Sequence, residues 1–297
     1  MKDGFLKAAA LSPALRVADC AYNVRQITDA LHKAAARGVK LAVFPEFCLT
    51  GYTCGDLFLQ RTLQTGALDA LSTLLDETKA LDVVTLVGLP LLVHGKLYNC
   101  AAVLCHGRIL GLVPKTYLPN YGEFYEKRQF TPGSTEVELV EVCGQQVPFG
   151  TSLLFRCRQM PSFVLGVEIC EDLWSALPPS TFHALAGATV IANLSASDET
   201  VGKAEYRRAL VSNQSARLLC GYVYADAGEG ESTTDMVFAG HNMVAENGAL
   251  LAETAPFCGG MALTDIDVER LAGERLKNTS FPAEDNANYE VIPFVLP

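Results

Sequence analysis

Three residues of chemically active types stand where apolar runs of the sequence end. Glu46, Lys115 and Cys170 lie far apart in the chain, but each follows a short segment rich in Leu, Val and Ile. Such segments predict buried strands. In α/β folds, functional sites gather where strands end, because the sheet is rigid and the loops leave a crevice there. A carboxylate, an amine and a thiol can therefore converge.

These three groups together suffice for amide cleavage. A thiol has a pKa of about 8.5, a neighbouring ammonium lowers that pKa, and a carboxylate can accept the thiol proton. The ammonium can also stabilise the oxyanion of a tetrahedral intermediate. The carboxylic acid can then protonate the leaving amine and later activate water. This chemistry passes through a thioester and needs no metal or cofactor.

Each residue taken alone also has a plainer interpretation. Glu46 fits a solvated position at the start of a loop, and Lys115 fits a surface lysine at a strand end. Cys170 is followed by Glu171 and Asp172, whose charges would raise its pKa, as is typical of an inert thiol. Residue types alone leave these alternatives open.

The apolar pattern predicts one α/β domain with mixed strands and outer helices. Gly-containing pairs at His106-Gly107 and Asn247-Gly248 predict hairpin turns, and residues 116–132 predict a long loop. Strands are predicted at 5–11, 40–45, 83–89, 97–105, 108–113, 164–169, 190–194, 221–225, 242–245, 249–253 and 261–266, and helices at 23–37, 63–79, 179–187, 203–220 and 268–276.

Composition narrows the possible partners and locations. The chain has 23 basic and 33 acidic residues, a net charge of −10, which argues against nucleic acid and against anionic membranes. We find no apolar run of about 18 residues, and the first residues do not resemble a signal peptide. Ten cysteines occur without a CxxC pair or zinc-like spacing, so we expect reduced thiols, a cytoplasmic location and no metal site.

Three segments resemble the signature blocks of the nitrilase superfamily of carbon-nitrogen hydrolases. They are residues 43–52, 113–119 and 166–174, and each carries one of the three candidate residues in the family's order and spacing. The resemblance implies an α-β-β-α sandwich. It also implies Cys170 as nucleophile, Glu46 as general base and Lys115 as oxyanion partner, with Glu123 matching a second glutamate beside the site.

Further segments resemble one branch, the glutaminase domains of glutamine-dependent NAD⁺ synthetases. They are residues 56–58, 117–126, 170–174, 193–197 and 222–235. The branch implies hydrolysis of the glutamine side-chain amide through a cysteinyl thioester.

The same branch implies a set of residues that bind glutamine. They are Tyr121, Glu171 and Ser197, together with Tyr52 and Phe124. Loop packing for the aromatic residues, and a turn or helix cap for Ser197, remain alternatives.

The resemblance also predicts how the chain is organised. Residues 1–275 would form the nitrilase-type glutaminase domain, and residues 276–297 a connector toward a synthetase domain. That domain would use ATP and Mg²⁺ to make NAD⁺ from deamido-NAD⁺ with the released ammonia. Its phosphate-binding loop, of the type Ser-Gly-Gly-x-Asp-Ser, is not found in this sequence. The family implies homo-oligomers built on a dimer. The alternatives are an amidase for another small amide or carbamoyl compound, and a non-catalytic oligomerisation scaffold.

Overall fold

The computed structural model describes residues 3–296, and the strands in this range form two sheets of eight and seven strands. From edge to edge, the first sheet contains β14 (Gly260–Asp267), β1 (Phe5–Ser12), β2 (Leu41–Val43), β3 (Val84–Val93), β4 (Lys96–Cys105), β5 (Arg108–Pro114), β7 (Gln145–Phe149) and β6 (Glu138–Val142). Its central strands β1, β2 and β3 run parallel.

The second sheet contains, in order, β13 (Ala249–Glu253), β12 (Met243–Glu246), β11 (Gly221–Asp226), β10 (Val190–Ser195), β9 (Val164–Ile169), β8 (Leu153–Cys157) and β15 (Glu290–Phe294). Strands β9, β10 and β11 are parallel, so their carboxyl ends lie side by side at the same end of the sheet.

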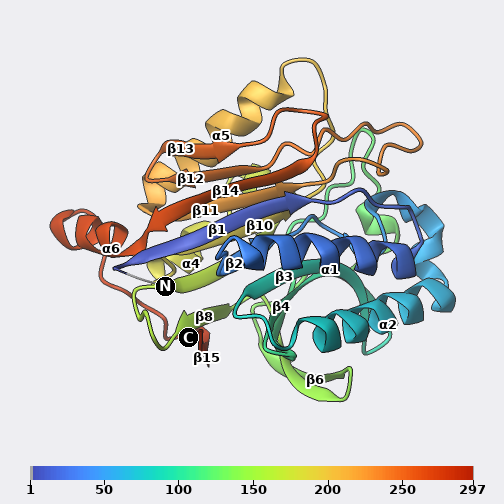
Figure 1. The fold of residues 1–297 in the computed structure, drawn as a ribbon, viewed down its shortest axis with the longest axis horizontal. Coiled ribbons are helices and arrows are strands. Elements are labelled where there is room, and N and C mark those ends of the chain that lie inside the picture. The colour runs from blue at the N-terminus through green and yellow to red at the C-terminus, as the bar shows by residue number, and fades with distance from the viewer. Residues whose placement is uncertain (1–2, 297) are drawn as a thin grey trace.

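Helices cover the outer faces of the two sheets. The helix α1 (Cys20–Ala36) lies beside α2 (Arg61–Thr78) and both pack on the first sheet, as Figure 1 shows. The second sheet is covered by α3 (Glu171–Trp174), α4 (Pro179–Leu185) and α5 (Lys203–Leu218), while α6 (Val268–Lys277) follows β14. Two 3₁₀ helices, η1 (Tyr52–Leu59) and η2 (Glu126–Arg128), lie in loops.

The core between the sheets follows from alternation along the strands. In β1, Leu6, Ala8 and Ala10 face the second sheet, whereas Ala9 and Leu11 face the helices, because successive side chains of a strand point to opposite sides. Every layer is thus apolar on the surface that another layer covers. The predicted α-β-β-α sandwich is confirmed.

The predicted elements are present with boundaries shifted by a few residues, and both hairpin turns are confirmed. Strands β6, β7 and β8 were not predicted. The stretch predicted as a connector contains β15, which pairs with β8 in parallel at the edge of the second sheet (Figure 1). Across residues 3–296, no helix combines the length and the apolarity needed to cross a membrane.

Candidate active site

The three residues predicted to act together come from the ends of three strands in two sheets. Glu46 follows β2, and Lys115 follows β5 directly, so both belong to the first sheet. Cys170 follows β9 of the second sheet and precedes α3. Their exposed fractions are 0%, 1% and 6%, so all three are buried and the solvated alternatives for Glu46 and Lys115 do not apply.

Lys115 stands between two carboxylates. Its Nζ lies 2.7 Å from Glu46 Oε1 and 2.6 Å from Glu126 Oε1. Asn99 Nδ2 donates to Glu46 Oε1 at 2.5 Å, and the Tyr52 hydroxyl donates to Glu126 Oε1 at 2.8 Å. This network fixes the buried ammonium and both buried carboxylates.

The charged groups in this network shift one another's pKa values. Burial disfavours the charged form of Lys115, but Glu126 and Glu46 outweigh it and hold the lysine pKa well above its usual range. Burial raises the pKa of Glu126 to about 7, opposed by the charge of Lys115. The two carboxylates therefore favour the charged form of Lys115, whereas burial disfavours the charged form of Glu126.

Cys170 occupies a constrained backbone position. Its φ of 42° and ψ of −99° lie outside the regions that non-glycine residues prefer. Its N–H donates to Leu194 O at 3.0 Å and to Asn193 Oδ1 at 3.1 Å, and these bonds hold the turn. Strain of this kind persists only where surrounding contacts enforce it, and it is typical of functional sites.

The surroundings of the Cys170 thiol favour its protonated form. Burial and the charge of Glu46 raise the pKa of Cys170 well above its usual range, while Lys115 lowers it. Glu46 Oε2 is buried and has no hydrogen-bond partner among the described residues, whereas Oε1 binds Lys115 and Asn99. An oxygen in this condition is suited to receive a proton.

The structure brings Tyr121 and Glu171 together, whereas Ser197 forms its hydrogen bonds with other residues. The Tyr121 hydroxyl donates to Glu171 Oε1 at 2.8 Å on the exposed side of the site. Ser197 is buried: its Oγ accepts from Arg207 Nη2 at 3.2 Å, and its N–H donates to Asp226 Oδ1 at 2.8 Å. These bonds link Ser197 to the helix α5 and to the end of β11.

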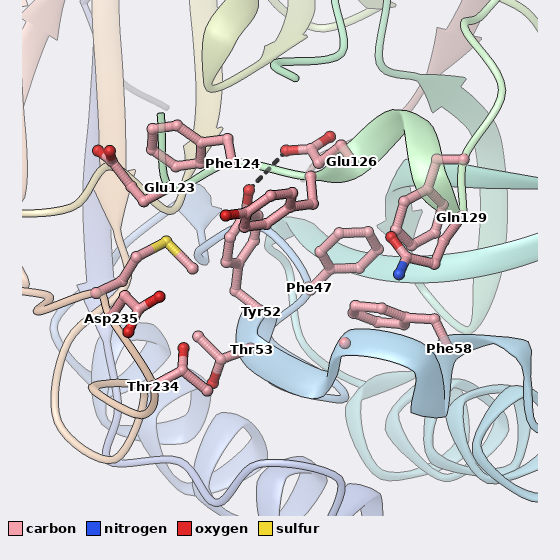
Figure 2. A pocket seen from close by; sticks show the side chains of 14 residues that line it. Phe47, Tyr52, Thr53, Phe58, Glu123, Phe124, Glu126, Gln129, Thr234 and Asp235 are labelled. Carbon is pink, nitrogen blue, oxygen red and sulfur yellow. Dashed lines mark hydrogen bonds between the residues drawn. The ribbon is translucent and has the colours of Figure 1, made fainter. Parts of the chain in front are cut away.

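Tyr52 and Phe124 line a cavity of about 310 Å³ next to the buried network. Figure 2 shows Tyr52 joined to Glu126 at its centre, with Phe47 and Phe58 to one side and Glu123 and Phe124 to the other. The remaining wall is supplied by Thr53, Gly55, Tyr125, Gln129, Phe130, Thr234, Asp235 and Met236.

The second glutamate on the ammonium is Glu126, not Glu123. Glu123 lines the cavity, while Glu126, three residues later on η2, contacts Lys115. A catalytic part for Glu123 remains a prediction. The loop 116–132 has no period that would indicate which of its acidic residues turns inward.

Sequence reasoning also missed Asn99. It lies within β4 and binds Glu46, and it donates weakly to Glu126 Oε2 at 3.4 Å. Its signal was available, since a buried amide within an apolar strand requires a polar partner. For the residues from 3 to 296, no cluster of three or more His, Cys, Asp or Glu side chains suited to a metal ion is found.

The family model described as carbon-nitrogen hydrolase matches residues 7–275. A glutamine-dependent NAD(+) synthetase of Mycobacterium bovis is 47% identical over 288 residues, which cover 96% of this chain and 42% of that protein. One from Thermotoga maritima is 33% identical over 88% of this chain and 42% of that protein. The chain thus spans less than half the length of these relatives.

Solved structures with a similar fold come from the same kinds of protein. A glutamine-dependent NAD(+) synthetase from Cytophaga hutchinsonii superposes with a TM-score of 0.79 at 29% identity, covering 88% of this chain and 43% of that one. An amidase from Nesterenkonia sp. AN1 superposes with a TM-score of 0.68 over 93% of this chain and 97% of that one. Its identity of 20% supports the fold alone.

Proposed function

The chain belongs to the carbon-nitrogen hydrolase family, and from this membership we propose that it hydrolyses the side-chain amide of glutamine to glutamate and ammonia. One observation carries the proposal: Lys115 is buried against Glu46, whose Oε2 has no hydrogen-bond partner among residues 3–296, and the charges of both residues act on the pKa of the Cys170 thiol. Glutamine is favoured as substrate because the relatives similar over nearly the whole chain are glutamine-dependent.

The proposed reaction begins with proton transfer from the Cys170 thiol to Glu46. The sulfur attacks the amide carbon, and the Lys115 ammonium stabilises the negative oxygen that forms. Glu46 then gives the proton to the leaving nitrogen, so that ammonia departs and a thioester remains. Water, deprotonated by Glu46, attacks the thioester carbon. The carbon–sulfur bond breaks, glutamate leaves, and the Cys170 sulfur takes the proton back from Glu46. The cycle needs no cofactor.

Recognition of glutamine is assigned to the predicted residues around this site. Glu171, held by Tyr121, offers a carboxylate for the substrate ammonium. Tyr52 and Phe124, which line the cavity, offer aromatic walls. The family resemblance gives Ser197 the part of binding the substrate carboxylate through its hydroxyl, which accepts from Arg207 in this structure.

The ammonia would serve an ATP-dependent synthetase domain that uses Mg²⁺ and makes NAD⁺ from deamido-NAD⁺. This part of the proposal draws on relatives more than twice as long as the matched region. We further propose homo-oligomers built on a dimer and a cytoplasmic location. All ten cysteines are free thiols, which accords with a reducing compartment.

The test is ammonia release from L-glutamine by the purified chain, with asparagine and N-carbamoyl amino acids in parallel. We expect release from glutamine by the wild type and none by Cys170→Ala, which should fold normally. Cys220→Ala is the matched control, because Cys220 is also buried but precedes β11 at the opposite end of the sheet.

Other outcomes would change the assignment. Release from another amide, lost in Cys170→Ala, would replace glutamine with that substrate. An active Cys170→Ala would reject the nucleophile. A wild-type thiol that is inert to an affinity label would favour the scaffold.

A further inference from the structure

Asp172 is a buried carboxylate that the proposed chemistry does not use. It lies on the first turn of α3, two residues after Cys170, and its exposed fraction is 1%. Its oxygens accept backbone N–H groups from two separate segments. Oδ2 accepts from Ile169 at 2.9 Å, while Oδ1 accepts from Tyr117 at 2.8 Å and from Thr116 at 3.2 Å.

These two segments belong to different sheets. Ile169 is the last residue of β9 in the second sheet and precedes Cys170. Thr116 and Tyr117 follow Lys115, which comes directly after β5 of the first sheet. One carboxylate therefore binds the backbone beside the thiol and the backbone beside the ammonium.

Such an arrangement is energetically demanding. Burial raises the pKa of Asp172 to about 8, and the N–H groups of Ile169 and Tyr117 oppose that effect. A carboxylate in an apolar interior is tolerated only when its oxygens are hydrogen-bonded. The two segments must therefore stay close enough to share it.

We propose that Asp172 is a positioning residue that sets the separation between the Lys115 ammonium and the Cys170 thiol by binding the strand ends of both sheets. The inference rests on the proposed function, because it takes Lys115 and Cys170 as the acting pair. The requirement is strict, since a displacement of about 1 Å at a reacting group can lower a rate on the order of 100-fold.

The experiment compares wild type with Asp172→Asn. Asparagine keeps an oxygen for Thr116 and Tyr117 but turns an NH₂ group toward the Ile169 N–H, which breaks the link to the second sheet. The readout is alkylation of Cys170 by iodoacetamide as a function of pH, followed by mass spectrometry of its peptide. The exposed Cys143 and Cys258 provide an internal reference in the same sample.

We expect Asp172→Asn to move the pH midpoint of Cys170 alkylation upward. The reason is that Lys115 lowers the pKa of this thiol, and a retracted ammonium lowers it less. Glutamine turnover should fall by at least about tenfold. The rates at Cys143 and Cys258 should not change.

Glu246→Gln is the matched control. Glu246 is also a buried carboxylate that accepts a backbone N–H across the sheets, from Asp267 of β14 at 2.7 Å. It pairs with Gly221 at the start of β11, far from the catalytic ends of the strands. This variant should lower stability without moving the alkylation midpoint.

A folded Asp172→Asn with the wild-type alkylation midpoint would overturn the proposal. Should that variant fail to fold, amide hydrogen exchange of the wild type decides. The Thr116 and Tyr117 amides lie beyond the strand, and we expect them to exchange as slowly as strand amides. Exchange of these two amides at the rate of a free loop would reject the proposed role of Asp172. Alkylation does not depend on glutamine, so failure of the proposed substrate would be seen separately.

Discussion

Lys115 determines which oxygen of Glu46 is available for chemistry. The ammonium and the Asn99 amide both bind Oε1, and Oε2 is left without a partner among the described residues. The proton-accepting oxygen is therefore selected by hydrogen bonding and not by chance rotation of the carboxyl group.

Glu46→Gln tests this selection. Glutamine can keep its oxygen on Lys115 and Asn99, but its NH₂ group then replaces Oε2 and cannot accept a proton. We expect turnover of glutamine to fall on the order of 100-fold to 10,000-fold, the usual contribution of a general base, with a thioester that hydrolyses slowly. Mass spectrometry after rapid acid quench should detect that thioester. Normal turnover in a folded variant would exclude Glu46 as the base.

At the scale of elements, loops far apart in the sequence support the site. Glu231, in the loop after β11, accepts the Tyr52 N–H at 2.8 Å and thereby holds the start of η1, whose Tyr52 binds Glu126. Its other oxygen, Oε1, is buried without a partner in the described part of the chain. Burial raises the pKa of Glu231 to about 8.

This carboxyl should make stability depend on pH. Its pKa is higher in the folded than in the unfolded chain, so its contribution is complete below about 4.5 and is lost as pH rises through about 8. One pKa unit corresponds to about 1.4 kcal/mol. Glu231→Gln keeps the bond to Tyr52 and should remove this loss. Urea unfolding of both proteins at pH 5 and pH 9 measures this loss of stability. An equal change in the free energy of unfolding between the two pH values for wild type and Glu231→Gln would contradict the assignment.

The last strand should contribute to stability as part of the sheet. Phe294 of β15 is buried, and its ring centre lies 5.7 Å from that of Phe163. Phe294→Ala should lower the free energy of unfolding by about 3–5 kcal/mol, the usual cost of such a cavity. Val295→Ala, at a half-exposed neighbour, should cost far less. Equal, small effects of the two substitutions would favour the prediction that this stretch serves as a connector.

Strand ends were predictable from the sequence because continuous apolar runs stop abruptly at Pro45, Pro114 and Cys170. Strand β6 was not, because only two of its five residues are buried at the sheet edge and its pattern is weak. The position of Glu126 in the site was not predictable either, because its inward direction depends on contacts with Tyr52 and Lys115. The sequence thus predicted positions on strands better than positions in loops.

At the scale of the molecule, the two sheets share one core. Phe155 of β8 lies between them, and a Cβ on Gly111 of β5 would come within 2.8 Å of its ring, so a glycine is needed at that contact. The sheets are therefore packed closely where β5 faces β8.

Phe155→Ala should show that the sheets unfold together. We expect a loss of about 3–5 kcal/mol and a single transition that coincides by circular dichroism and tyrosine fluorescence. Two separate transitions would indicate that each sheet is stable without the other.

The division of the reacting groups between two sheets also has a consequence for synthesis of the protein on the ribosome. A ribosome releases Glu46 and Lys115 well before Cys170 and the strands that surround it. A nascent chain therefore carries the ammonium of Lys115 before the sulfur of Cys170 is present. The reacting groups meet only when the two sheets have packed together, so hydrolysis cannot precede folding.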